Sequence, residues 1–137
     1  MSVFSYHLIP TSVFTGLKAV FSTARTQVPG LQHMECMHLM TLGAPVFSAS
    51  RLLLKKLAVF AQWESETALN EFLKQNRLGR MLDKGWHVRL AFLRQWGSVQ
   101  ELRITDEPEE SAPDMPVVAI TLARMRLPEV PRFIRWG

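Results

Sequence analysis

The order in which apolar residues change their spacing constrains the fold of this chain more than any other feature. Alternating or β-branched apolar stretches predict strands over residues 3–9, 31–42, 51–62 and 86–96. Apolar residues at helical spacing predict one helix from Thr11 to about Ala24 and helical stretches from Ser65 to Gly85. A hydroxyl at the start of a helix accepts hydrogen bonds from the free amide groups of the first turn, and Thr11, Ser12 and Ser65 can do so here. The predicted order is strand, helix, strand, strand, helix, strand.

This order is typical of an α+β domain with the ferredoxin-like βαββαβ arrangement. Such a domain has a four-stranded antiparallel sheet, and two helices cover one of its faces. The third and fourth predicted strands carry apolar residues on both faces, so the second face would leave a large apolar patch in water. We therefore expect two copies of the chain to pair through that face, giving a homodimer with a dimeric α/β barrel.

Length and composition agree with one such unit. The chain has 137 residues, of which 47% are hydrophobic and 20% charged, enough apolar material for a single core. Its single cysteine excludes an intrachain disulfide framework. The amino terminus does not resemble a signal peptide, and no apolar run approaches the roughly 20 residues of a membrane span. We expect a cytoplasmic protein without a transmembrane segment.

The net charge of +4 raises the question of nucleic-acid binding. The basic residues are scattered along the chain, apart from one group, Arg124, Arg126, Arg132 and Arg135. No helix-turn-helix, zinc-finger or aromatic RNA-binding signature accompanies them, so a solvated basic surface is the expected explanation. The sequence also lacks a Gly-x-Ser-x-Gly elbow, a Walker motif and a dinucleotide-binding glycine pattern, which disfavours hydrolases and nucleotide-dependent enzymes.

The carboxyl-terminal part of the chain differs in character from the rest. We expect the ferredoxin-like unit over residues 1–104 and an acidic, proline-rich loop over residues 105–116. Residues 117–137 then predict a strand and a short helix. Because the chain opens with the same pattern, this stretch reads as the start of a truncated second repeat. A fifth strand that docks on the sheet edge or on a partner explains it equally well.

The predicted strand over residues 31–42 concentrates side chains that can do chemistry. Strand alternation places Met34, Cys36, His38 and Met40 on one face. Their imidazole, thiol and thioether groups are soft ligands suited to haem iron or copper. Methionine and cysteine also fill irregular core space well, so a purely structural role for this face is the alternative.

The other face of the same strand carries His33 and Glu35. A carboxylate beside an imidazole orients the ring and raises its basicity. If the two side chains point into a cavity, they form a proton-transfer pair. An exposed polar pair on the strand is the alternative.

Aromatic residues and an arginine gather on the fourth predicted strand. Alternation places Trp86, Phe92, Arg94 and Trp96 on one side. The arginine there can bind a carboxylate or an oxyanion in a mostly apolar pocket, or lie at the sheet edge with its stem on a tryptophan. Trp63, at the end of the third strand, is a further candidate for the pocket, or it anchors the helix that follows.

One pattern runs through several separate segments. It comprises Pro29-Gly30-Leu31, the turn at Gly43, residues 57–64 (LAVFAQWE) with the helix start Glu66-Thr67-Ala68, residues 86–90 (WHVRL) with Leu93-Arg94, and residues 118–124 (VAITLAR). Together these segments resemble the spheroidene monooxygenase-like proteins of the dimeric α/β barrel superfamily. The resemblance implies a barrel made by two facing sheets, sometimes with an oxygenation site inside. Haem is thought to serve some family members, whereas other barrel oxygenases need no cofactor.

These observations give two hypotheses about function. The first is a monooxygenase-like enzyme that acts on an apolar small molecule between the sheets. Its catalytic candidates are His33, Glu35 and Arg94, with His38 as the candidate haem ligand. The second is a non-catalytic small-molecule-binding or assembly module that uses the same cavity; a fragment without activity of its own is a weaker third. The candidate pocket residues are Cys36, Met40, Trp63, Trp86, Phe92 and Trp96.

Overall fold

A four-stranded antiparallel sheet organises the computed structural model, which describes residues 2–22, 27–40, 52–99, 102–108, 110, 114–123 and 127–136. The strands lie in the order β2-β3-β1-β4, and every neighbouring pair is antiparallel. Their bounds are β1 Val3–Pro10, β2 Leu31–Met40, β3 Leu52–Trp63 and β4 Trp86–Leu90. This confirms the predicted α+β class, and the strand order is compatible with a ferredoxin-like fold.

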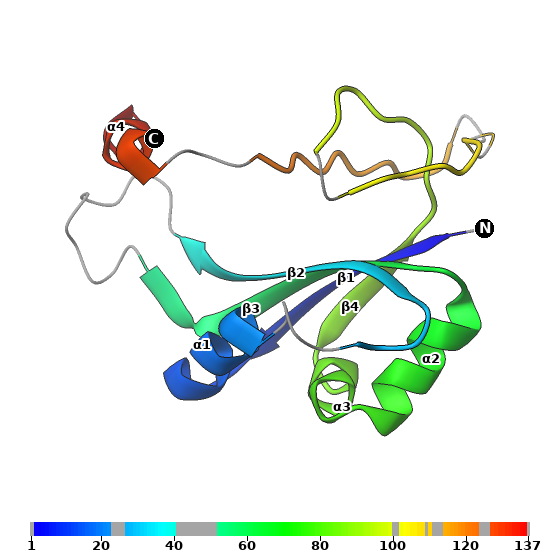
Figure 1. Ribbon diagram of the computed structural model, residues 1–137, viewed down its shortest axis with the longest axis horizontal. Coiled ribbons are helices and arrows are strands. Elements are labelled where there is room, and N and C mark those ends of the chain that lie inside the picture. The colour runs from blue at the N-terminus through cyan, green and yellow to red at the C-terminus, as the bar shows by residue number, and fades with distance from the viewer. Residues whose placement is uncertain are drawn as a thin grey trace.

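Three helices share one side of the sheet. They are α1 (Val13–Ser22), which follows β1, and the consecutive helices α2 (Glu66–Gln75) and α3 (Arg77–Asp83), which lie between β3 and β4 in the sequence. Figure 1 shows all three below the sheet and the chain beyond β4 above it. We call the first side the helix face. The second side is the tail face, because Leu102, Ile104 and Leu122 from beyond β4 pack on it.

Apolar side chains from the sheet and from α2 and α3 form the core on the helix face. Trp63 is fully buried there, and its ring centroid lies 4.9 Å from that of Phe72. The indole nitrogen of Trp63 donates a hydrogen bond of 2.9 Å to the hydroxyl of Ser5, which is also fully buried. The buried members of this core are Ile9, Leu57, Val59, Ala61, Trp63, Leu69, Phe72, Leu73 and Leu82.

We expect the Ser5→Ala variant to lose about 1–3 kcal/mol of its free energy of unfolding. The substitution leaves the buried indole N–H of Trp63 without its acceptor, and an unsatisfied buried donor costs about that much. Urea denaturation measures the effect. Ser98→Ala, at an exposed position, is the matched control and should stay within about 0.5 kcal/mol of the parent. Equal stability of the two variants would contradict the role given to this bond.

The ends of the helices are fixed by side chains. Ser65 caps α2 as predicted, since its hydroxyl accepts a hydrogen bond from the amide of Ala68 at 3.2 Å. Asn76 stands between α2 and α3, and its Oδ1 accepts from the amides of Leu78 and Gly79 at 2.9 and 3.4 Å. The amide of Asn76 donates in turn to the carbonyl of Phe72. One residue therefore ends α2 and starts α3.

The tail face is partly covered by the chain itself. Phe4 and Phe60 stack with ring centroids 5.9 Å apart and are each only 4% exposed, because Leu102 packs against them. The prediction left this face to be covered by a second copy of the chain. In the structure the cover over its centre comes from residues beyond β4.

Two predicted strands differ from the structure. The fourth strand ends at Leu90 instead of residue 96, because Leu90 pairs with Phe4 and only Val3 of β1 remains beyond it. Residues 117–122, a predicted strand, have no regular secondary structure. The helix predicted near the carboxyl end is confirmed as α4 (Val130–Trp136), preceded by the 3₁₀ turn η3 (Leu127–Glu129). The predicted ends at residues 24, 42 and 51 lie outside the described residues.

Candidate functional site

A partly open cavity of about 390 Å³ lies between α1 and the pair α2–α3 on the helix face. Leu31 and Met34 of β2 contribute to its lining from the sheet. The other lining residues come from α1 (Phe14, Thr15, Lys18, Ala19), from Val28, and from α2, α3 and the residue between them (Phe72, Asn76, Arg77, Leu78, Met81). We call this space the interhelix cavity. Its volume lies within the roughly 300–1,000 Å³ range of small-molecule sites.

The interhelix cavity exists because the helices pack on different parts of the sheet. Helix α1 contacts β2 and β3, whereas α3 contacts β1 and β4 as well as α2. Gly16 brings the backbone of α1 close to β2: a Cβ there would lie only 2.6 Å from Cε1 of His38. In the same way Gly79 brings α3 against the backbone of α2. Helix α1 thus lies close to β2, α3 lies close to α2, and a space remains between α1 and the α2–α3 pair.

Most of the cavity lining is apolar, and its charges have one sign. The apolar part includes Met34, Leu78 and Met81. The charged residues are Lys18 and Arg77, and none of the described residues that line the cavity is acidic. A smaller recess of about 220 Å³ shares Val28, Phe72 and Asn76 with it and has Glu71 in its lining.

The structure brings together the first pair of predicted catalytic residues. His33 Nε2 lies 3.1 Å from Glu35 Oε1, and their side chains are 11% and 32% exposed. Both residues point to the tail face, since His33 pairs with Gln62 and Glu35 with Phe60 of β3. The pair therefore lies on the opposite side of the sheet from the interhelix cavity.

The other face of β2 has the predicted alternation. Met34, Cys36 and His38 pair with Ala61, Val59 and Leu57, whose side chains belong to the helix face. Of these three, only Met34 lines the interhelix cavity, and Cys36 packs against the core. The side chain of Met40 lies outside those that the structure describes.

His38, the candidate haem ligand, is placed against protein atoms. Its Nδ1 lies 3.3 Å from the carbonyl oxygen of Lys56, and the backbone of α1 at Gly16 lies against Cε1 and the buried Nε2. A haem ligand needs open space beside one ring nitrogen for the planar macrocycle. The close approach of α1 takes that space, so this position does not fit haem.

The predicted aromatic pocket follows the edge strand β4. Trp86 is 59% exposed and meets Tyr6 edge-on, and Phe92 packs near Phe4 on the tail face. The guanidinium carbon of Arg94 lies 5.6 Å from the centroid of the Trp96 ring. This is the second of the two predicted arrangements, in which the arginine packs on a tryptophan. Because β2 and β4 are the opposite edges of the sheet, these residues lie apart from His33 and Glu35. Trp63, the remaining candidate, is in the core.

Two histidines share a buried place under α3. His7 of β1 is 1% exposed, and its ring stacks on that of His87 of β4 with centroids 5.3 Å apart. Neither ring nitrogen of His7 has a hydrogen-bond partner among the described residues. The pKa of His7 is lowered from 6.5 to about 4, chiefly by burial and to a smaller extent by the neighbouring His87 and Arg89, against a weaker opposing effect of Asp83. His7 is therefore neutral at pH 7.

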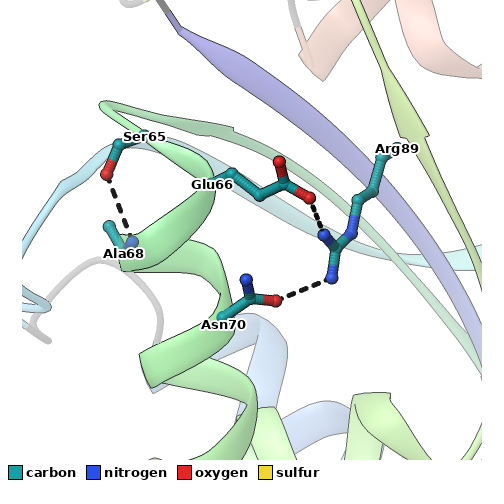
Figure 2. A network of polar contacts seen from close by, with 5 residues as sticks. All are labelled: Ser65, Glu66, Ala68, Asn70 and Arg89. Carbon is teal, nitrogen blue, oxygen red and sulfur yellow. Dashed lines mark hydrogen bonds and ion pairs between the residues drawn. The ribbon is translucent and has the colours of Figure 1, made fainter.

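Arg89, the next residue of β4 on the helix face, connects the sheet to α2. Figure 2 shows its guanidinium group between Glu66 and Asn70 of α2, with Ser65 and Ala68 forming the helix cap nearby. Nη1 donates to the carboxylate of Glu66, and Nη2 donates to Oδ1 of Asn70 at 2.7 Å. This arrangement holds α2 to the edge strand, a structural role.

The part of the chain that the structure describes has neither a metal-ligand cluster nor a membrane-spanning helix. No group of three or more His, Cys, Asp or Glu side chains there could hold a metal ion. Among the described helices, none is long and apolar enough to cross a bilayer.

Over the residues that the structure describes, the chain is an α+β domain with a partly open, mostly apolar cavity between its helices. Comparison with known proteins adds no relative: no protein-family model, no curated protein and no solved structure matches the chain. The resemblance to spheroidene monooxygenase-like proteins stays a prediction.

The residues of the interhelix cavity could not be recognised as a site from the sequence. Phe14 is apolar and stands at helical spacing from Leu17, yet it is 88% exposed beside the cavity. Lys18 and Arg77 lie far apart in the sequence, and no motif links these two basic residues. They line the same cavity because of the way α1 and α3 pack on the sheet. The spacing of apolar residues along the chain does not predict that packing.

Proposed function

We propose that the chain is a small-molecule-binding module that takes an apolar ligand, or the apolar part of one, into the interhelix cavity. The observation that carries this proposal is the cavity itself: about 390 Å³, with Met34, Leu78 and Met81 in its lining. Removing apolar ligand surface from water supplies the driving force, about 25 cal/mol per Å². The few polar residues of the lining would orient the ligand.

Binding without catalysis agrees best with the groups at hand. The polar residues that line the interhelix cavity are Thr15, Lys18, Asn76 and Arg77. No His, Cys, Asp or Glu is among the described lining residues, so the imidazole, thiol and carboxylate groups that often serve in acid–base or nucleophilic catalysis are missing from this part of it. The His33–Glu35 pair lies on the other side of the sheet and cannot act on a ligand held here.

The monooxygenase hypothesis and the homodimer stay secondary proposals. The contact of His33 with Glu35 supports proton-transfer chemistry at the tail face. Exposed Trp86 and Trp96 at the β4 edge support an apolar contact with a second copy. The barrel formed by two facing sheets and the cytoplasmic location also stay predictions.

We test the binding proposal with decan-1-ol, a neutral probe with one long apolar chain, by isothermal titration calorimetry. The Ala19→Phe variant places a phenyl ring in the lining of the interhelix cavity. We expect it to weaken binding by about tenfold or more, because the ring takes up volume that the probe needs.

The matched control is Ala91→Phe, which adds the same ring at an exposed position just beyond β4. It should bind decan-1-ol as the parent protein does. Circular dichroism spectra establish that both variants are folded. Equal affinity of the folded Ala19→Phe variant and the parent would mean that the probe binds elsewhere and would overturn the proposal.

A further inference from the structure

We propose that the ligand of the interhelix cavity is an anionic amphiphile, with its apolar chain in the cavity and its anionic head group at Lys18 and Arg77. This inference rests on the proposed function and adds the chemical class of the ligand. A monocarboxylate with a long alkyl chain is the simplest member of that class.

The charged residues of the cavity lining indicate an anionic ligand. Lys18 belongs to α1 and Arg77 is the first residue of α3, so the two cations stand on the two sides of the interhelix cavity. No ion pair among the described residues uses either of them, and α1 contains no acidic residue. An anion between the two walls would therefore meet two cations that the described part of the chain does not neutralise.

The hydrogen-bonding group that Asn76 offers to the cavity also suits an anion. Oδ1 of Asn76 is already used by the amides of Leu78 and Gly79, which leaves its NH₂ group as the part that can bond to a ligand. That group is a donor and suits an anionic oxygen. Glu71 lies in the neighbouring smaller recess and not in the interhelix cavity, so it would repel a head group displaced in that direction.

The apolar part of the cavity accounts for the tail of the ligand. Met34, Leu78 and Met81 offer flexible or branched apolar surface, and methionine adapts to an irregular chain. Phe14 lies beside them with 88% of its surface in water. An alkyl chain that leaves the cavity past Phe14 would cover part of this ring. Two cations and one apolar space thus match the two ends of one amphiphile.

Three probes with the same decyl chain test the inference by calorimetry: decanoate, decan-1-ol and decyltrimethylammonium. Decanoate is ionised at neutral pH. We expect it to bind about five- to tenfold more tightly than decan-1-ol, because each cation near the surface contributes a modest attraction. The cationic probe should bind more weakly than the alcohol. Raising the salt concentration should reduce the preference for decanoate, since salt screens exposed charges.

The double variant Lys18→Gln with Arg77→Gln removes both cations. It should lose the preference and bind decanoate and decan-1-ol about equally. The control, Lys74→Gln with Arg80→Gln, makes the same net-charge change on α2 and α3 at exposed residues outside the cavity lining. It should keep the preference for decanoate.

The outcomes separate this inference from the proposed function. Equal binding of the three probes, each weakened by Ala19→Phe, would overturn the anionic ligand and leave the cavity as a binding site. A preference for decanoate that persists in the Lys18 and Arg77 double variant would also overturn it. Binding of no probe, or binding that Ala19→Phe does not change, would overturn the proposed function.

Discussion

The Gly79→Ala variant is expected to lose about 3 kcal/mol or more of its free energy of unfolding. A Cβ at this buried position in α3 would overlap the carbonyl oxygen of Phe72 and lie 2.6 Å from the carbonyl carbon of that residue. These are backbone atoms of α2, so they can move only if the two helices separate. Alanine is otherwise the better helix residue, by about 1 kcal/mol. A loss of stability would therefore come from the helix contact alone.

Urea denaturation of the variant and the parent measures this loss. Arg80→Ala, the next position of α3 and exposed, is the matched control and should stay within about 0.5 kcal/mol of the parent. A Gly79→Ala protein as stable as the parent would show that α2 and α3 do not approach each other as closely as described. Phe72 of α2 and Leu78 of α3 line the interhelix cavity next to this contact. The same result would therefore also contradict the described shape of the cavity.

Acid is expected to destabilise the protein through His7. Burial lowers its pKa to about 4 in the folded chain, against 6.5 for an ordinary histidine. The unfolded chain therefore takes up the proton at a higher pH than the folded chain does. The contribution to stability is complete above about pH 6.5 and is lost as the pH falls towards 4, by about 3 kcal/mol in all. About 2 kcal/mol of this should be lost between about pH 7 and about pH 5.

Free energies of unfolding at these two pH values provide the measurement. The His7→Leu variant should lose most of the difference between them, because it has no group to protonate at that position. His38→Gln, in the edge strand β2 at the far side of the sheet, is the control and should keep the difference. A parent protein whose stability is the same at both pH values would contradict the burial of His7 against His87.

Local patterns in the sequence predicted much of the fold. The alternation of β2 places Met34, Cys36 and His38 on one face and His33 with Glu35 on the other, as the strand pairing confirms. Ser65 caps α2 as its position before an apolar helical stretch predicts. Such features depend on residues a few positions apart, where backbone geometry alone fixes which side chains share a face.

Features that depend on distant segments could not be predicted in the same way. The end of β4 at Leu90 is set by the length of its partner β1. The cover over Phe4 and Phe60 comes from Leu102, more than forty residues beyond the nearer of the two. The interhelix cavity depends on the close contacts at Gly16 and Gly79, and no periodic pattern shows which parts of the sheet two helices will leave uncovered.

The position of a bound apolar chain tests the central claim most directly. Nuclear magnetic resonance of protein labelled at the methionine methyl groups can follow the titration with decan-1-ol. Met34 and Met81 line the interhelix cavity, whereas Met37 packs on the tail face. We predict that the methyl signals of Met34 and Met81 shift and show contacts to the alkyl chain, while the signal of Met37 stays in place. A shift of Met37 with Met34 and Met81 unchanged would contradict the account.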